Sequence, residues 1–413
     1  MNGAAAHTIT VFEHDKLTLK HPQLDESILE QLQRYHGESG TPYFSLIHKG
    51  VQFNQYVGVI QVGRVMIEVL PKTDRPADID GQNEERLWRD ILIRMLRRTM
   101  GIEAEATSES GLTLQRNSVL DLYLELFLTE CEHIIRRGRT KRYRQVARNQ
   151  TAMKGRLHMS RHISQNAIHK ERFYVEYNTY DHNHLLNRLL AETLRVLETQ
   201  FNKPRYYSRI KNLLLEFEDC SSITPAPKHF ENLTFTRKNE YYRKALQIAR
   251  LILLNYHPDL SRGHNHVLAL MFDMNRLWEG YVGNMLSKHL SDTHTVIRQK
   301  SSLFWKSEHT SRKLRPDFLL TSDLPDYPDI ILDTKWKTPP NRTPSDEDLR
   351  QMFAYNKFFG VKRSLLLYPG EYDNVEGSFE TADGDSCGAV FVRVMDERGD
   401  LRWDEDSVFM EFL

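Results

Sequence analysis

Cysteine is scarce in this chain of 413 residues, which contains only Cys131, Cys220 and Cys387. The three stand far apart and form no CxxC pair, which argues against a disulfide framework and against a structural zinc site. A GxxxxGK[ST] phosphate-binding loop is also missing. We therefore expect the chain to bind no nucleotide and to contain no nucleotide-hydrolysing motor of its own.

Long apolar runs are missing as well. No stretch is long enough to cross a bilayer, and no basic-then-apolar signal peptide opens the sequence. We therefore expect a cytoplasmic protein with no membrane contact. A length of 413 residues is more than one compact core usually accommodates, so two or three domains are expected.

Net charge is zero, but the charges are unevenly distributed. From His133 to Lys170 there is no acidic residue, and eleven residues are Lys or Arg. Such a patch suits contact with DNA phosphates. A basic surface that pairs with an acidic partner protein is an equally good interpretation. The residues predicted to bind DNA are the densest part of the patch: Arg136, Arg137, Arg139, Lys141, Arg142, Arg144 and Arg148.

Changes of pattern along the chain predict an α+β protein of several domains. Residues 1–80 contain alternating, strand-like segments and form a β-rich N-terminal module. Residues 81–265 show helical spacing and form a mainly helical region that carries the basic patch. Residues 266–413 combine strand and helix patterns and form an α/β domain. The polar stretch Thr73–Gly81 is a plausible linker between the first two.

The C-terminal region carries the most informative pattern. Asp317 stands directly before the apolar run Phe318–Leu320, and Asp333 directly after Ile330–Leu332. Both runs are typical of buried strands, and alternation along a strand places Asp333 and Lys335 on the same side. Two carboxylates suit a hard divalent cation such as Mg²⁺ or Mn²⁺. A lysine beside them can orient or deprotonate a water, or stabilise negative charge in a transition state.

A helix is predicted over Asp346–Phe359, because Thr343-Pro344-Ser345 precedes it and Gly360 follows it. Gln351 and Tyr355 are four residues apart in this helix and so lie on one face. The apolar run Ser364–Tyr368 then predicts another buried strand.

Upstream, a long helical pattern over Val267–Leu290 carries Glu279, and Thr295–Gln299 is predicted as the strand after it. Acidic residues on amphipathic helices usually face water, so a solvated position and a metal-binding role are equally good interpretations of Glu279. The predicted order of this region is helix, three strands, helix, strand.

A lone Asp-x-Lys on a strand is more often a solvated edge than an active site. Here Asp333 follows three large aliphatic residues, where an unpaired buried carboxylate would be costly. It needs a metal or an ion-pair partner, and Lys335 alone would supply the latter. The order and spacing of the motifs favour the catalytic interpretation.

These motifs resemble the PD-(D/E)xK nuclease fold, with Asp317 and Asp333-x-Lys335 as its signature, and Gln351-x-x-x-Tyr355 resembles the extra motif of its RecB-like branch. The resemblance implies that Asp317 and Asp333 hold the metal and that Lys335 acts on the water or the transition state. It also implies that Gln351 and Tyr355 orient the site or the DNA backbone.

The resemblance extends beyond the C-terminal region. Glu279 stands where the nuclease fold often places an acidic residue on its first helix, as a further metal ligand. The segments Tyr56–Gly63 and Ile67–Lys72 resemble the N-terminal module of McrC, the nuclease subunit of McrBC modification-dependent restriction systems. Lys154-Gly155-Arg156 and Asn183–Arg188 continue this resemblance through the middle of the chain.

McrC-like proteins work with a separate hexameric AAA+ GTPase, McrB, whose companion domain recognises modified cytosine in double-stranded DNA. The resemblance therefore implies a Mg²⁺-dependent type IV restriction endonuclease subunit that docks on this motor, stimulates it and cuts DNA. Lys49–Gln55 and Arg136–Arg148 are the candidate docking surfaces. Two alternatives stay open: a self-sufficient RecB-like nuclease in repair or defence, and a non-enzymatic adaptor that activates an AAA+ motor.

Overall fold

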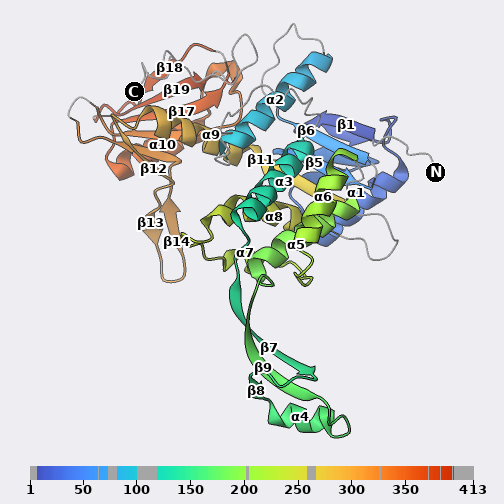
Figure 1. Cartoon of the computed structure of the whole chain (residues 1–413). Helices are drawn as coiled ribbons and strands as arrows, with labels where there is room; N and C mark the ends of the chain where they lie inside the picture. Colours follow the sequence, from blue (N-terminus) through green and yellow to red (C-terminus); the bar gives the residue numbers. More distant parts are fainter. Residues whose placement is uncertain are drawn as a thin grey trace. The chain divides into compact units, whose positions relative to one another are not determined.

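The computed structural model shown in Figure 1 describes residues 7–63, 65–72, 81–99, 119–200, 204–257, 267–324, 327–370, 372–381, 383–392 and 394. The chain forms two compact units, one made of Met1–Val119 with Met271–Leu413 and the other of Leu120–Leu270. The first and third of the predicted segments, 1–80 and 266–413, thus fall largely in one unit. The predicted linker at 73–80 lies outside the described residues.

The N-terminal part of the first unit is rich in strands, as predicted. Strand β6 pairs in parallel with β1 and antiparallel with β5, and a smaller sheet has the order β2-β4-β3. The elements are β1 (His7–Phe12), β2 (Lys16–Thr18), α1 (Glu26–Ser39), β3 (Phe44–Ile47), β4 (Gly50–Phe53), β5 (Tyr56–Val62), β6 (Val65–Leu70) and α2 (Gly81–Thr99).

The C-terminal part is built on a six-stranded sheet with the order β12-β15-β16-β17-β19-β18. Strands β16, β17 and β19 run in parallel, and β12, β15 and β18 add antiparallel pairs on either side. The strands are β12 (Thr295–Arg298), β15 (Phe318–Thr321), β16 (Ile330–Thr334), β17 (Arg363–Pro369), β18 (Val375–Ser378) and β19 (Ser386–Val392).

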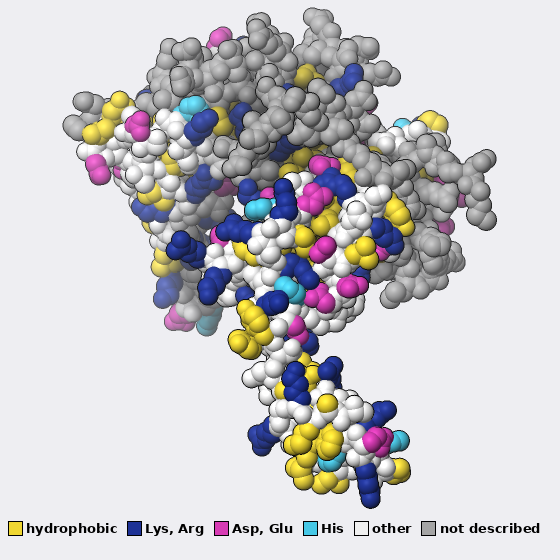
Figure 2. Space-filling view, in the orientation of Figure 1, with side chains coloured by type: hydrophobic (Ala, Val, Ile, Leu, Met, Phe, Trp, Pro, Cys, Tyr) yellow, Lys and Arg dark blue, Asp and Glu magenta, His cyan; other side chains and the backbone are white. Residues whose placement is uncertain are grey.

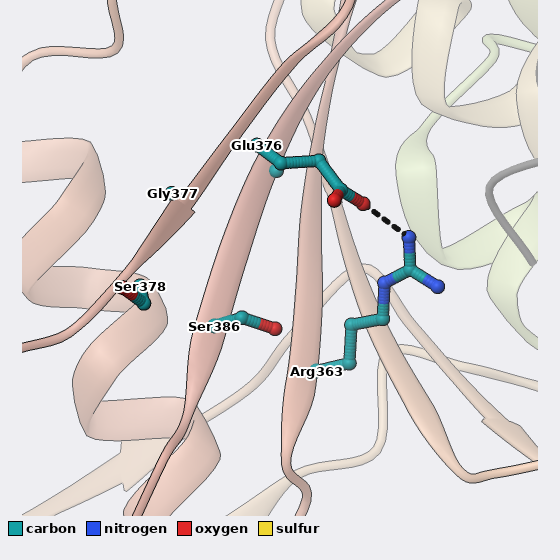
Figure 3. A pocket seen from close by; sticks show the side chains of 6 residues that line it. Arg363, Glu376, Gly377, Ser378 and Ser386 are labelled. Carbon is teal, nitrogen blue, oxygen red and sulfur yellow. Dashed lines mark hydrogen bonds and ion pairs between the residues drawn. The ribbon is translucent and has the colours of Figure 1, made fainter.

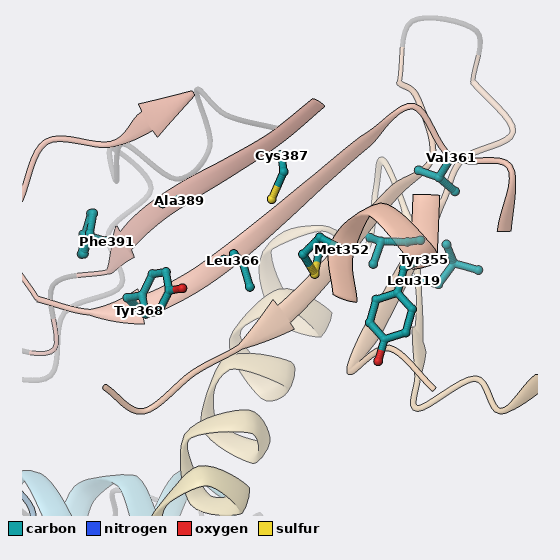
Figure 4. Close-up of a cluster of buried hydrophobic side chains, with 10 residues drawn as sticks. Leu319, Met352, Tyr355, Val361, Leu366, Tyr368, Cys387, Ala389 and Phe391 are labelled. Atoms are coloured by element: carbon teal, nitrogen blue, oxygen red, sulfur yellow. The ribbon is translucent and has the colours of Figure 1, made fainter. Parts of the chain in front are cut away.

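Helix α10 (Asp346–Phe359) makes the crossover between the parallel strands β16 and β17. It has the predicted bounds: the Ser345 side chain caps its first turn, and Gly360 ends it with a left-handed φ of 70°. Met352 and Tyr355 pack from this helix into the apolar cluster of Figure 4. The cluster also contains Leu319, Ile331, Val361, Leu366, Tyr368, Cys387, Ala389 and Phe391.

Helix α9 (Met274–His289) approaches the same sheet at Phe318. A Cβ on Gly283 of this helix would lie 2.7 Å from the Phe318 ring, so only glycine permits the approach. Phe318 and Leu319 are both buried although they point to opposite faces of the strand. The sheet is therefore covered on both faces.

The single helix predicted over Val267–Leu290 is wrong in its first part. Val267–Asp273 forms strand β11, and α9 begins only at Met274. The apolar run in β11 is buried throughout, so it shows neither a helical nor an alternating period. Asp273 ends the strand and caps the helix, because its side chain accepts hydrogen bonds from the backbone N–H groups of the next turn.

Two strands that follow β12 and precede β15 in the chain form a separate two-stranded ribbon. They are β13 (Ser302–Lys306) and β14 (Ser311–Leu314). The predicted order for this region did not include the ribbon. Its residues are mostly exposed on both faces, so their sequence carries no alternation between apolar and polar positions.

The second unit combines helices with a long hairpin. Its elements are α3 (Val119–Arg137), β7 (Arg142–Gln150), β8 (Arg156–Leu157), α4 (Met159–Asn166), β9 (Phe173–Asp181), α5 (Leu185–Gln200), α6 (Pro204–Glu216), α7 (Pro227–Glu231), α8 (Arg243–Leu254) and β10 (Tyr256–His257). Strands β7 and β9 pair along their whole lengths, and the segment between them carries β8 and α4. We call Arg142–Asp181 the finger (Figure 1).

The finger was not predicted, although most of the elements in the middle region are helices. Strand β7 is largely exposed and carries three arginines, so it lacks the alternation by which a half-buried strand is identified. Buried Asn187 fixes the base of the finger: the Nδ2 group donates to the carbonyls of Thr140 (3.1 Å) and His182 (2.8 Å). The Tyr242 hydroxyl donates to Asn187 Oδ1 at 2.9 Å.

Among the described residues, no helix has the length and hydropathy to span a bilayer.

Candidate active site

The candidate site lies where β15 and β16 run side by side. Their register pairs Phe318 with Leu332, so the preceding Asp317 lies opposite Asp333. Asp317 Oδ2 accepts hydrogen bonds from the backbone N (2.7 Å) and the Oγ1 (2.6 Å) of Thr334. The two acidic residues of the sequence motif are therefore held on adjacent strands at one point of the sheet.

Lys335 connects this point to helix α10. Its Nζ lies 2.6 Å from Asp333 Oδ2, so the prediction that these two side chains share a side is confirmed. Lys335 also donates to Gln351 Oε1 at 3.0 Å. Gln351 Nε2 contacts Asp333 Oδ1 at 3.4 Å and donates to the Tyr355 hydroxyl at 2.8 Å. Five residues predicted from separate segments thus meet in one group, four of them in a single hydrogen-bonded network.

The pKa values of Asp333 and Lys335 are both raised, but for different reasons. Burial raises the pKa of Asp333, the nearby Asp317 carboxylate raises it further, and Lys335 only partly opposes these effects. Burial by itself would lower the pKa of Lys335, but the surrounding carboxylates, Asp333 first, outweigh it and raise that pKa. A divalent cation beside Asp317 and Asp333 would relieve their mutual repulsion. The donor set therefore fits a hard metal ion.

Glu279 lies on α9 and is oriented by Gln299, whose Nε2 donates to Glu279 Oε1 at 2.6 Å. Burial raises the pKa of Glu279, and the carboxylate of Asp317 adds to the increase, so Glu279 lies within electrostatic range of the site. Within the described part of the chain, however, no three His, Cys, Asp or Glu side chains come close enough to hold a metal together. Its role as a further ligand stays a prediction.

A second carboxylate, Asp348, stands behind Lys335 and was not predicted. It is buried in the first turn of α10, and its Oδ2 lies 2.6 Å from Lys337 Nζ. Ser345 and Tyr368 donate hydroxyl hydrogen bonds to the same oxygen, at 2.8 and 3.2 Å. Burial alone would raise the pKa of Asp348, but Lys337 first, and then Ser345 and Lys335, lower it below its usual value. In the sequence Ser345-x-x-Asp348 indicates only a helix start.

Trp336, next to Lys335, makes a contact that no sequence pattern indicates. Its Nε1 donates to Oε1 of Glu13 at 2.7 Å, and the backbone N of Lys72 donates to the same oxygen at 2.7 Å. Glu13 is only 1% exposed, and its Oε2 makes no hydrogen bond with the described residues. Burial accordingly raises the pKa of Glu13 to about 7. The N-terminal part thus supports the strand end that carries Lys335.

Replacing Glu13 with glutamine is expected to stabilise the protein more at about pH 8 than at about pH 5. Because the folded-state pKa is raised from 4.5 to about 7, the carboxyl stabilises the fold fully below its unfolded pKa and loses this contribution as pH rises through 7. The loss amounts to about 3 kcal/mol, and glutamine does not titrate. Thermal melting of both proteins over this range tests the expectation; a difference that does not change with pH would contradict it.

The seven basic residues predicted to bind DNA lie in the second unit, at the end of α3 and along β7. Some of their charge is already neutralised, since Arg139 pairs with Asp219 at 2.7 Å and Arg144 with Asp181 at 3.0 Å. Arg148 donates to Gln150 at 2.9 Å and lies over the Tyr177 ring. Their contact with DNA stays a prediction.

A pocket at the opposite end of the parallel strands offers no comparable chemistry (Figure 3). It is lined by Arg363, Glu376, Gly377, Ser378, Ser386 and Gly388, and its two charged groups pair with each other at 2.7 Å. Arg363 stands opposite Ile330, at the start of β16, whereas Asp333 stands near the end of that strand. The pocket is therefore separate from the candidate site.

The sequence of the chain matches a known protein family. The family described as McrBC 5-methylcytosine restriction system component matches residues 51–369. The chain belongs to this family. The match covers strands β5 and β6 of the N-terminal part and the candidate site of this McrBC family protein. Among curated proteins, no match to the chain was found.

A solved structure shares the fold of this McrBC family protein. A chain in a refined half-complex from a tetradecameric assembly of Thermococcus gammatolerans McrB AAA+ hexamers with bound McrC has a TM-score of 0.67 and 21% identity. The alignment covers 96% of this chain and 97% of that one. A chain in the cryo-EM structure of the Thermococcus gammatolerans McrBC complex has a TM-score of 0.47 and 22% identity, covering 68% of this chain and 88% of that one.

Proposed function

We propose that this McrBC family protein is the DNA-cleaving subunit of a modification-dependent restriction system and that its C-terminal part is a PD-(D/E)xK nuclease domain. One observation carries the proposal: Asp317, Asp333, Lys335, Gln351 and Tyr355, identified from motif spacing, converge where the inner strands β15 and β16 meet helix α10. A coincidental Asp-x-Lys on a solvated strand edge would not bring a glutamine and a tyrosine from α10 to the same point.

The fit of the donor set supports Mg²⁺ or Mn²⁺ as the cofactor, with Asp317 and Asp333 as its protein ligands. Such an ion, when bound, neutralises phosphate charge and makes hydroxide available near neutral pH. Lys335 is held charged by the carboxylates around it, so it suits stabilising negative charge on the phosphate better than removing a proton from water. Gln351 orients both Asp333 and Lys335, and Tyr355 fixes Gln351.

The partner in this proposal is an McrB-like AAA+ GTPase hexamer, because the chain shares its fold with a chain of an McrB–McrC assembly. The finger is the docking element that the structure favours. Its end carries exposed apolar side chains, and Figure 2 shows them gathered there among Lys and Arg side chains. An exposed apolar patch on a protruding element is typical of a protein interaction site. The patch consists of Met153, Met159, Ile163 and Ile168.

Cleavage assays with the purified chain test the function as a whole. We expect double-stranded DNA with modified cytosine to be cut only when Mg²⁺, the McrB-like partner and GTP are all present, and EDTA to stop the reaction. Cutting by the chain with Mg²⁺ alone would favour the self-sufficient nuclease instead. Stimulated GTP hydrolysis without any cutting would favour the adaptor.

Replacing Ile163 with aspartate is expected to abolish stimulation of the partner's GTPase. Ile163 is 63% exposed on α4, so a carboxylate there disturbs no core but places a charge in an apolar interface. GTP turnover at increasing concentrations of the chain measures the effect. Tyr207, a large exposed side chain on α6, provides the control through Tyr207→Asp. Equal stimulation by wild type and Ile163→Asp would show that the finger tip is not the docking site.

A further inference from the structure

The ribbon β13–β14 projects from the sheet that carries the candidate site (Figure 1). It exposes three large apolar side chains in succession: Leu303 is 51% exposed, Phe304 54% and Trp305 50%. Apolar side chains clustered on a protruding ribbon do not help to bury a core. Such a cluster is typical of a surface that binds something.

The charge of the ribbon indicates what it binds. Strand β13 ends in Lys306, and β14 contains Arg312 and Lys313, while Glu308 in the turn is the only acidic residue from Ser302 to Leu314. Within the described part of the chain, no ion pair engages any of these three basic side chains. A basic surface with interleaved aromatic residues is complementary to nucleic acid.

Both ends of the ribbon lead into the candidate site. Before β13, Gln299 donates its backbone N–H to the Asp317 carbonyl at 2.8 Å and its side chain to Glu279 at 2.6 Å. After β14, the Arg315 carbonyl accepts a hydrogen bond from Tyr355 at 3.2 Å. A polymer lying along the ribbon is therefore directed to the carboxylates.

A β-bulge in the pairing of β13 with β14 gives the two aromatic side chains of the ribbon, Phe304 and Trp305, different surroundings. The register shifts between Leu303 and Trp305, so Phe304 is the bulged residue. Its ring packs against Phe358 on α10, with 5.8 Å between ring centroids, and this contact anchors the ribbon. Trp305 stands opposite Arg312 in the register, which places an aromatic and a guanidinium side by side.

We propose that the ribbon lies in the major groove of duplex DNA next to the phosphate that is cut. The major groove is wide enough for a two-stranded ribbon. Lys306, Arg312 and Lys313 contact the phosphates on either side, and Trp305 contacts the sugar and base edges between them. The inference rests on the proposed function, because it assigns a substrate-holding role to an element beside that site.

DNA binding by the full chain, measured by fluorescence anisotropy in EDTA, tests the ribbon without any cleavage. Lys306→Ala, Arg312→Ala and Lys313→Ala combined are expected to weaken binding of a duplex and to reduce the slope of log affinity against log salt by about 3. The matched control replaces three basic residues on α9 and α10: Arg276, Lys288 and Arg350. An unchanged affinity and slope, or an equal change in the control, would overturn the inference.

Trp305 provides the second test. Trp305→Ala is expected to raise the KM for duplex DNA while leaving kcat within about twofold, because it loses a contact made equally before and during the reaction. Trp305→Phe should restore most of the affinity, and Leu324→Ala, an exposed apolar control, should change nothing. A greater loss on single-stranded DNA, or lost GTPase stimulation with normal duplex binding, would overturn the duplex assignment.

Duplex binding by the ribbon variants and cleavage by the wild type test the ribbon's role and the nuclease activity separately. Ribbon variants that bind duplex normally, beside a wild type that cuts, would refute the ribbon's role and leave the nuclease in place. Ribbon variants that lose duplex binding, beside a wild type that never cuts, would support the surface and refute the nuclease.

Discussion

Replacing Asp333 with asparagine is expected to abolish DNA cleavage and to leave the fold and DNA binding intact. The asparagine has the same shape and keeps one oxygen that can accept a hydrogen bond from Lys335, while its amide nitrogen replaces the oxygen beside Gln351. It removes the charge that a metal ion would require. We expect a loss of at least about 10²-fold, as for groups that stabilise charge in a transition state. Cleavage of modified duplex DNA by the complex with the partner, GTP and Mg²⁺ measures it.

Asp346→Asn is the matched control, because this carboxylate is 89% exposed in the first turn of α10. It should cut at the wild-type rate. Thermal melting of the Asp333→Asn protein should show a folded protein of about wild-type stability, since the buried carboxylate was itself destabilised by Asp317. Undiminished cutting by the purified Asp333→Asn protein would refute the active-site assignment.

Replacing Lys335 with alanine is expected to lower the cleavage rate by about 10²–10⁴-fold, the range found for removal of a catalytic acid, base or charge-stabilising group. Lys335→Arg should restore little, because a guanidinium is larger and planar and cannot occupy the space between Asp333 and Gln351 in the same way. The rate at saturating DNA, rather than at limiting DNA, isolates the chemical step.

Lys337→Ala tests whether Lys335 or the neighbouring Lys337 acts in catalysis. Lys337 pairs with Asp348 at 2.6 Å, whereas Lys335 lies 3.9 Å from Asp348 and 2.6 Å from Asp333. Losing Lys337 leaves Asp348 with Ser345, Tyr368 and the more distant Lys335, so Asp348 competes with Asp333 for Lys335. We therefore expect a partial reduction in rate through the altered position of Lys335. A Lys337→Ala protein as inactive as Lys335→Ala would mean that the catalytic lysine has been misassigned.

The sequence predicts which residues of the candidate site come together, because their placement is set locally. A carboxylate after an apolar run, a lysine two residues on and a polar pair on one helix face are all fixed by the periods of strands and helices. Helix α10 was predicted to the residue, since Ser345 and Gly360 are strong end signals. The pairing of β15 with β16 then brings these segments together.

What the sequence did not reveal has two physical causes. The ribbon and strand β7 of the finger are exposed on both faces, so neither shows a hydrophobic period. The supports behind the catalytic candidates depend on contacts between distant segments. Nothing near Glu13 indicates that its side chain accepts a hydrogen bond from a tryptophan 323 residues away.

That hydrogen bond would be lost in a C-terminal fragment of the protein. A fragment beginning at residue 266 would contain every predicted catalytic side chain, yet Trp336 would lose the acceptor that Glu13 provides. Its indole N–H would be left without its partner directly beside Lys335. The candidate site is therefore supported by the first residues of the chain, and an inactive C-terminal fragment would say nothing about the activity of the whole.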